Sequence, residues 1–310
     1  MNKHIEILVN INPVWAEYVS ELLINKIGCL GIVTEEKEFK DEKIIKADLE
    51  TVKGYLPFTE DFDLEKIRII LQKDRQDLIF SGIKEETLGN WSVISREIKE
   101  EEWADNWKKF WHPQKIGSKI VICPTWEDYK QKDDEIIIKL DPGSAFGTGT
   151  HPTTRLCLTA LEKISDELNG EFSVADVGMG SGILAITGIK LGAYNATGVD
   201  NDASVISVAI DNAKKNNVED KCRFFTGSAK DIQGEYDIVV ANILTEVLVT
   251  IMSDLEKLLK PEGILILSGI IKRKLPEIET ALEKNLLKIK EVPEEENWVA
   301  PIVTRIKADL

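Results

Sequence analysis

The first hundred residues alternate between two hydrophobic periodicities. His4–Ile11 alternates apolar and polar side chains with a period of two, which predicts a half-buried strand. From Pro13 to Gly28 the apolar residues recur at helical spacing, and these two residues are typical of a helix start and stop. Three further strands are predicted at Cys29–Thr34, Lys46–Pro57 and Trp91–Ile98. A second helix is predicted to begin at Asp63, between the last two of these strands. The order strand–helix–strand–strand–helix–strand predicts a small, ferredoxin-like α+β domain.

An aromatic segment follows this domain. In KEEEWADNWKKFWHP the four large aromatic residues lie three or four positions apart, so they share one face of a predicted helix that ends at Pro113. The helix is either an amphipathic linker that packs against the next domain, or its aromatic face forms part of the wall of the active site. We therefore expect an N-terminal domain over residues 1–98, a linker helix over 99–114 and a second domain over 115–310.

The pattern changes after Lys115. Short apolar runs there alternate with helical patterns, which predicts a doubly wound, Rossmann-like parallel sheet. The runs are apolar throughout, as expected for strands whose two faces are both covered by helices. Near the end, segments 286–292 and 297–307 flank the acidic residues Glu294–Glu296 and predict a terminal hairpin.

Composition limits the classes of protein that fit. The chain has 310 residues, of which 43% are hydrophobic, which is enough for two domains. Its net charge of −15 disfavours a nucleic-acid binder and favours a basic partner, although acidity can also serve solubility alone. The four cysteines lack metal-ligand spacing, and neither a signal peptide nor a membrane span is visible. We expect a cytoplasmic protein with no metal site and no membrane contact.

The strongest local signal is a glycine-rich turn after a predicted strand that ends at Val177. Gly178, Gly180 and Gly182 let the backbone approach a bulky ligand, and the following helix offers free N–H groups. Asp200 closes the next predicted strand, 22 residues after Gly178, where an acidic side chain accepts hydrogen bonds from ribose hydroxyls. The alternative is a tight turn that holds no ligand.

The spacing of the glycines separates two kinds of cofactor. A dinucleotide fingerprint reads G-x-G-x-x-G, whereas this chain reads G-x-G-x-G with Ile183 next. Asp176 lies two residues before the first glycine, and its charge would repel a pyrophosphate but tolerate a sulfonium or an ammonium. Both features favour S-adenosylmethionine as the cofactor.

Other polar residues are candidates for the same site. Asn242 ends a later predicted strand and either contacts the ligand or caps the next helix. Ser228 and Asp231 either meet an adenine edge or act as a helix N-cap. The loop 142–150 is rich in Gly and Thr and either cradles a carboxylate, closes over the methyl group with Phe146 as a wall, or serves only as a connector. His151 has no second histidine or cysteine nearby, so a metal site is not expected there.

Together these segments resemble the PrmA family of ribosomal protein methyltransferases, which modify protein eleven of the large subunit. The resemblance rests on DPGSAFGTGTHPTT, DVGMGSGILAI, GVDND and ANIL, in that order, and it extends over the aromatic segment and the N-terminal domain. The first of these motifs is the most specific, because many methyltransferases share the second. The resemblance therefore covers nearly the whole chain.

The resemblance implies cofactor contacts at Thr154, Gly178, Asp200 and Asn242, to which the glycine turn adds Gly180. It implies that the α-amine and lysine side chains of a basic large-subunit ribosomal protein are methylated, and that the N-terminal domain recognises this target. We expect a monomer that needs no nucleic acid, and we assign no catalytic residue. The rival interpretations are a methyltransferase for a small amine or nucleobase, active from residues 117–310 alone, a binding protein without donor affinity, and a dehydrogenase.

Overall fold

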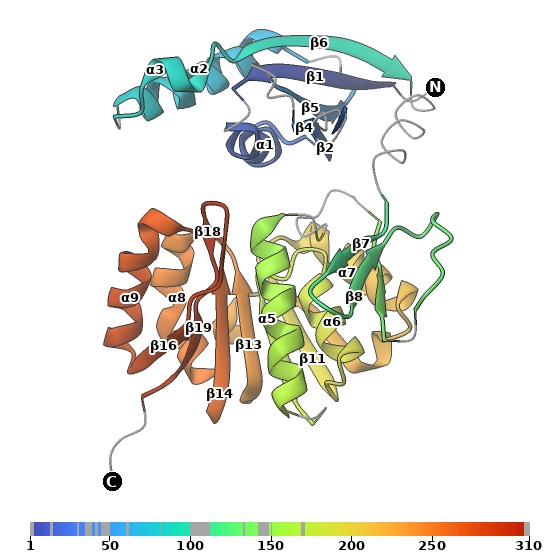
Figure 1. The fold of residues 1–310 in the computed structure, drawn as a ribbon, viewed down its shortest axis with the longest axis vertical. Coiled ribbons are helices and arrows are strands. Elements are labelled where there is room, and N and C mark those ends of the chain that lie inside the picture. The colour runs from blue at the N-terminus through green and yellow to red at the C-terminus, as the bar shows by residue number, and fades with distance from the viewer. Residues whose placement is uncertain are drawn as a thin grey trace. The chain divides into compact units, whose positions relative to one another are not determined.

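The computed structural model divides the chain into two compact units, Met1–Trp111 and His112–Leu310 (Figure 1). The residues that it describes are 3–12, 15–29, 31–34, 39–40, 43–44, 50–59, 62–80, 82–99, 112–132, 134–141, 149, 151–168 and 171–306. Most of the predicted linker helix and the loop residue Phe146 lie outside these ranges.

The N-terminal unit is a four-stranded antiparallel sheet in the order β2-β5-β1-β6. Alternate residues of β1, from Ile5 to Ile11, are buried against Leu23 of α1 and Leu71 of α2, so both helices cover one face. This order and the element sequence confirm the ferredoxin-like prediction. The elements are β1 (Lys3–Ile11), α1 (Ala16–Asn25), β2 (Gly31–Thr34), β3 (Phe39–Lys40), β4 (Lys43–Ile44), β5 (Glu50–Pro57), α2 (Leu64–Phe80), α3 (Glu85–Leu88) and β6 (Ser92–Lys99).

The C-terminal unit is built on a seven-stranded sheet in the order β12-β11-β10-β13-β14-β19-β16. Its first five strands are parallel and β19 is antiparallel to both neighbours, which confirms the doubly wound, Rossmann-like prediction. The strands are β10 (Ser173–Val177), β11 (Asn195–Asp200), β12 (Cys222–Thr226), β13 (Tyr236–Asn242), β14 (Leu259–Ser268), β16 (Leu287–Glu291) and β19 (Ile302–Arg305).

The side chains of the central strands alternate between two cores. Val174, Val240 and Ile266 pack with the helices α5 and α6, which Figure 1 shows on one face of the sheet. Ala175 and Leu265, on the adjacent positions, pack with α8 and α9 on the other face. Because successive strand residues point to opposite faces, continuous apolar runs produce this three-layer unit. The helices are α5 (Pro152–Leu168), α6 (Ile183–Lys190), α7 (Ala203–Lys215), α8 (Thr245–Lys257) and α9 (Leu275–Lys284), with short 3₁₀ turns at Glu219–Lys221, Ala229–Asp231 and Lys272–Lys274.

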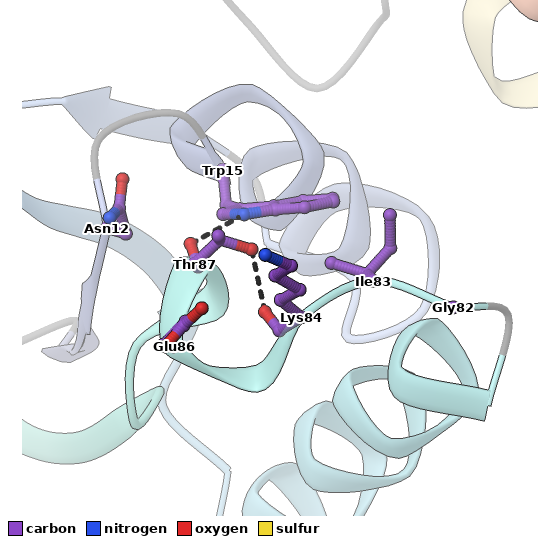
Figure 2. Close-up of a pocket in the computed structure, with 7 residues that line it drawn as sticks. All are labelled: Asn12, Trp15, Gly82, Ile83, Lys84, Glu86 and Thr87. Atoms are coloured by element: carbon purple, nitrogen blue, oxygen red, sulfur yellow. Dashed lines mark hydrogen bonds between the residues drawn. The ribbon is translucent and has the colours of Figure 1, made fainter.

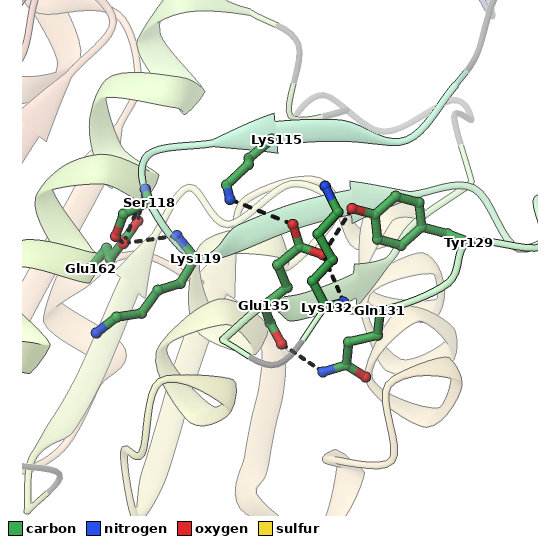
Figure 3. Close-up of polar contacts among 8 residues, drawn as sticks. All are labelled: Lys115, Ser118, Lys119, Tyr129, Gln131, Lys132, Glu135 and Glu162. Atoms are coloured by element: carbon green, nitrogen blue, oxygen red, sulfur yellow. Dashed lines mark hydrogen bonds and ion pairs between the residues drawn. The ribbon is translucent and has the colours of Figure 1, made fainter.

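A small sheet of β7 (Gln114–Ile116), β8 (Ile120–Cys123) and β9 (Ile136–Lys139) precedes α5 and is held by two buried glutamates (Figure 3). Glu162 of α5 accepts hydrogen bonds from the backbone N–H groups of Ser118 and Lys119, at 3.1 and 3.0 Å. Glu135 accepts one from the Tyr129 hydroxyl at 2.8 Å, which is the main reason that the pKa of Glu135 lies below its usual range. The hydrogen bonds to Glu162 attach the turn between β7 and β8 to α5.

Three elements differ from the sequence-based expectation. β7 begins at Gln114, inside the range assigned to the linker, and α9 was not predicted although Ile278, Ala281 and Leu282 have helical spacing and are buried. The terminal strands do pair, as β16 with β19, but the acidic segment between them is not a simple turn. Glu294–Glu295 forms β17, which joins β18 (Trp298–Val299) and β15 (Ile270–Ile271) in a second small sheet.

Candidate cofactor site

The glycine-rich turn directly follows β10, at the carboxyl end of the central parallel strand. The Gly178 N–H donates to the Val199 carbonyl at 2.8 Å, so the turn is tied to the neighbouring strand β11. Gly178, Gly180 and Gly182 have φ values of +73°, +51° and +76°. These conformations favour glycine, and the N-terminus of α6 follows directly at Ile183.

Asp200 connects the end of β11 to this turn. Its carboxylate accepts a hydrogen bond from the Gly180 N–H at 2.9 Å and one from the Asp202 N–H at 3.0 Å. The side chain is half-buried, and each carboxylate oxygen retains a second lone pair. The acidic group predicted to meet ribose hydroxyls therefore lies beside the glycine turn and also holds its shape.

Asn242 and Thr154 meet on the other side of β10. Asn242 ends β13 and is 8% exposed, whereas Thr154 lies fully buried in the first turn of α5. The Asn242 Nδ2 donates to Thr154 Oγ1 at 3.4 Å, and Asn242 Oδ1 is buried with no hydrogen-bond partner among the described residues. The alternative that Asn242 caps the next helix is wrong, since Leu244 is the N-cap of α8. A buried acceptor at this edge instead suits an N–H group of a ligand.

Close packing explains part of the glycine pattern. A Cβ atom on Gly178 would lie 2.2 Å from the Cγ2 of Ile243, the residue after Asn242. Gly269, after β14, has a φ of +79° and passes equally close to the Ile243 backbone, since a Cβ atom there would lie 2.3 Å from the Ile243 carbonyl oxygen. The sequence analysis attributed the first glycine either to ligand approach or to a tight turn. It carried no signal for Ile243, because the contact joins segments far apart in the chain.

Asp176 does not line the open edge. It is fully buried, and its Oδ2 accepts a hydrogen bond from the Ala185 N–H of α6 at 3.1 Å. Burial, the largest effect, raises the pKa of Asp176 to about 7; the Ala185 hydrogen bond opposes the rise and the Asp200 charge adds to it. The carboxyl is thus partly protonated at neutral pH, so its charge discriminates between ligands less than its position in the sequence indicated.

The remaining candidates have structural roles or lie outside the described residues. Ser228 and Asp231 form a capping box, which supports the N-cap interpretation. His151 is half-buried just before α5, and no cluster of metal-binding side chains occurs among the residues the structure describes. Within the same residues, no helix has both the length and the apolar character needed to cross a bilayer. The loop residues 142–148 belong to an undescribed segment.

A separate shallow hollow of about 450 Å³ lies within the N-terminal unit (Figure 2). Trp15 forms one wall, and its Nε1 donates to the Thr87 carbonyl at 2.9 Å. Ile83 lines the hollow, with Lys84 and Glu86 also among its lining residues. None of these residues carries the chemistry of the glycine turn, so this hollow has no feature of a second cofactor site.

The strand order, the glycine turn after β10 and the acidic end of β11 define a Rossmann-like methyltransferase that uses S-adenosylmethionine. The chain matches the family described as "Ribosomal protein L11 methyltransferase (PrmA)" over residues 3–306. It belongs to that family, and the resemblance seen in the sequence is confirmed.

Individual relatives agree over most of the chain. A "Ribosomal protein L11 methyltransferase" of Alkaliphilus oremlandii is 38% identical over 320 residues, which covers 98% of this chain and 99% of the relative. One with the same name from Halalkalibacterium halodurans is 46% identical over 216 residues, 69% of this chain and 68% of the relative. The crystal structure of a ribosomal protein L11 methylase from Lactobacillus delbrueckii subsp. bulgaricus is 35% identical with a TM-score of 0.58, and it covers 63% of this chain and 98% of that one.

Proposed function

We propose that this enzyme transfers methyl groups from S-adenosylmethionine to the α-amine and lysine side chains of large-subunit ribosomal protein L11. The observation that carries the proposal is the family match over residues 3–306, which includes both the catalytic unit and the N-terminal unit. A methyltransferase for small amines would need only the catalytic unit.

Within the site, Thr154, Gly178, Gly180, Asp200 and Asn242 hold the cofactor. The glycine turn and Asp200 hold the nucleoside, with the carboxylate accepting from the ribose hydroxyls. Asn242 Oδ1 is a buried hydrogen-bond acceptor without a partner among the described residues. It accepts a hydrogen bond from an N–H group of S-adenosylmethionine or of the amine that receives the methyl group. The residues at this edge therefore fit a nucleoside that carries a cationic, amine-bearing tail.

When bound, S-adenosylmethionine supplies a methyl group on a positively charged sulfonium. The acceptor amine must be neutral, although a free lysine has a pKa of about 10.4. A dry site disfavours the charged amine, as does a nearby positive charge. Buried groups such as Thr154 and Asn242 exclude water and orient the amine, so positioning and desolvation provide most of the rate.

The N-terminal unit recognises the target protein. Residues 1–111 carry 16 Lys and Arg against 23 Asp and Glu, a net charge of −7, which attracts a basic protein. The hollow beside Trp15 is the docking point, with the acidic Glu86 among its lining residues (Figure 2). Glu86→Lys should raise the KM for L11 several-fold without changing cofactor affinity, whereas Glu279→Lys, on an exposed site of α9, should change neither. A rise in ionic strength should slow association with L11.

The decisive test is mass spectrometry of purified large-subunit proteins incubated with the full chain and labelled S-adenosylmethionine. Label in L11 alone supports the proposal. Label in another protein, or in RNA, contradicts it. Titration calorimetry with S-adenosylmethionine and with a nicotinamide dinucleotide separates a methyltransferase from a dehydrogenase.

Three further expectations concern the cellular compartment, the oligomeric state and the need for nucleic acid. The enzyme acts in the cytoplasm as a monomer and needs no nucleic acid, since an acidic surface repels phosphate backbones. Light scattering of the purified chain tests the monomer, and methylation of free L11 in the absence of RNA tests the second expectation.

A further inference from the structure

The first turn of α5 carries Thr154, and the small sheet β15-β18-β17 packs against this end of the helix. Trp298 of β18 is 8% exposed and forms a separate apolar cluster with Leu156 of α5 and Ala300. This cluster is distinct from the two large cores on the faces of the main sheet. A segment near the C-terminus therefore supports the start of the helix that contacts Asn242.

His151 is the residue that caps α5. Its Nδ1 accepts a hydrogen bond from the Thr153 N–H at 3.3 Å and lies 2.7 Å from the Thr153 hydroxyl oxygen. Its carbonyl accepts from the Thr154 N–H at 3.0 Å. Burial, followed by the Arg155 charge, lowers the pKa of His151 to about 4, so the ring is neutral at physiological pH, and the hydrogen bond from the Thr153 N–H favours the tautomer in which Nδ1 is the acceptor. An imidazole thus serves where Ser, Thr, Asp or Asn is usual.

The His151 ring is fixed from the side by Trp298. The two ring centroids lie 5.1 Å apart with an interplanar angle of 66°, an edge-to-face arrangement. One residue after Thr154, the Arg155 guanidinium pairs with Glu295 of β17, with 2.9 Å between Nε and Oε1. An aromatic contact and an ion pair therefore join the first turn of α5 to the β17–β18 hairpin.

The same turn determines where the amide of Asn242 lies. Thr154 is three residues after His151, and its hydroxyl accepts from Asn242 Nδ2 at 3.4 Å. Since Thr154 is fully buried, a shift of the helix start moves its hydroxyl and the amide together. A displacement of about 1 Å at a catalytic centre can reduce rate about a hundredfold.

We infer that His151 and Trp298 are positioning residues for the methyl-transfer site, which they serve by fixing the first turn of α5 and, through Thr154, the amide of Asn242. The inference rests on the proposed role of Asn242 in holding the cofactor. Neither ring has to touch the cofactor or the acceptor amine.

The test uses four variants of the full chain, Trp298→Ala, Trp298→Phe, His151→Ala and His151→Asn, and measures the Kd for S-adenosylmethionine by calorimetry, with Tm recorded in parallel. We expect both alanine variants to bind the cofactor at least tenfold more weakly. Trp298→Phe retains an aromatic edge and His151→Asn retains a capping acceptor, so both should stay within about threefold of the parent chain.

Two controls separate positioning from general stability. Lys163→Gln removes an ion pair to Glu291 at 2.5 Å, two turns further along the same helix, and should leave the Kd within twofold. Leu282→Ala opens a cavity in the core beneath α9, and it supplies a chain with reduced Tm whose site is intact. Trp298→Ala must weaken binding at a temperature where both destabilised chains are fully folded.

Equal cofactor affinity in Trp298→Ala and Leu282→Ala under those conditions overturns the inference, because the rings then act only on stability. Failure of the conservative variants to restore affinity also overturns it. The readout is independent of the target protein: a chain that shows this binding pattern but leaves L11 unmethylated contradicts the proposed function and not the positioning role.

Discussion

The buried carboxylates of the N-terminal unit differ from the buried polar groups at the carboxyl edge of the parallel sheet in the C-terminal unit. In the N-terminal unit, Glu6 is 3% exposed, accepts a hydrogen bond from the Tyr55 hydroxyl at 3.0 Å and pairs with the Arg96 guanidinium. Asp74, also buried, pairs with Lys26 at 2.7 Å. Both buried carboxylates thus have partners within their own unit, and their burial serves the fold.

Near the carboxyl edge of the parallel sheet, two buried polar groups lack part of their hydrogen bonds. Asp176 Oδ1 and Asn242 Oδ1 are buried without hydrogen-bond partners among the described residues. An unsatisfied buried group of this kind costs about 1–3 kcal/mol. A fold tolerates such a cost where function requires the group, which agrees with the cofactor contact proposed for Asn242.

The largest expected effect concerns Asp176 and the pH. Below about pH 4 its carboxyl is protonated in both the folded and the unfolded chain. Between pH 4 and 7 only the unfolded chain releases the proton, so the free energy of unfolding falls as pH rises, by about 4 kcal/mol in total. Asp176→Asn should remove this slope, as measured by urea unfolding of both chains at pH 5, 6, 7 and 8.

Asp202→Asn is the matched control for that measurement. The Asp202 carboxylate accepts from Ser204, which holds its pKa below the ordinary value, so its titration lies below pH 5 and adds no slope between pH 5 and 8. Parallel pH profiles for Asp176→Asn and the parent chain would show that Asp176 is ionised in the folded enzyme.

A second change tests whether Gly178 serves packing or ligand. Gly178→Ala places a methyl group 2.2 Å from Ile243 Cγ2 at a φ of +73°, which should destabilise the chain by about 3 kcal/mol. Gly234→Ala, at a φ of +91° with no atom within 4 Å, should cost only about 1 kcal/mol. Denaturant titrations give both values.

Adding Ile243→Ala to Gly178→Ala removes the clash and should restore part of the stability. Recovery of stability without recovery of cofactor affinity assigns the glycine a second role at the ligand. Recovery of both assigns it to packing alone, which contradicts the cofactor contact proposed for Gly178.

Asp200→Asn should weaken S-adenosylmethionine binding by about 2 kcal/mol, or about 30-fold, because a neutral amide replaces a charged acceptor for the ribose. The amide oxygen can keep the hydrogen bond from the Gly180 N–H, but the one that the second carboxylate oxygen accepts from the Asp202 N–H is lost, so the free energy of unfolding should fall by about 1 kcal/mol. Calorimetry measures the affinity. An unchanged Kd would remove Asp200 from the cofactor site.

Local sequence patterns predicted the helices and strands of each unit better than they predicted the contacts between distant helices and strands within a unit. The glycine turn and Asp200 were visible because both follow predicted strands, and parallel strands bring their carboxyl ends to one edge. The contact between Thr154 and Asn242 was not visible, since it joins residues 88 positions apart. Trp298 had no motif around it, and its place beside His151 follows from the pairing of β15, β18 and β17.

The smallest expected effect lies in the unit without a cofactor site. Tyr55→Phe removes one hydrogen bond to the buried Glu6 while leaving Arg96 in place, which should cost about 1 kcal/mol. Amide hydrogen exchange should accelerate in β1 and β5, and cofactor affinity should remain as in the parent chain. Tyr194→Phe, at a ring 52% exposed in the C-terminal unit, should alter neither quantity. A weaker cofactor Kd in Tyr55→Phe would mean that polar burial in the N-terminal unit also serves the site, and the contrast between the two units would fail.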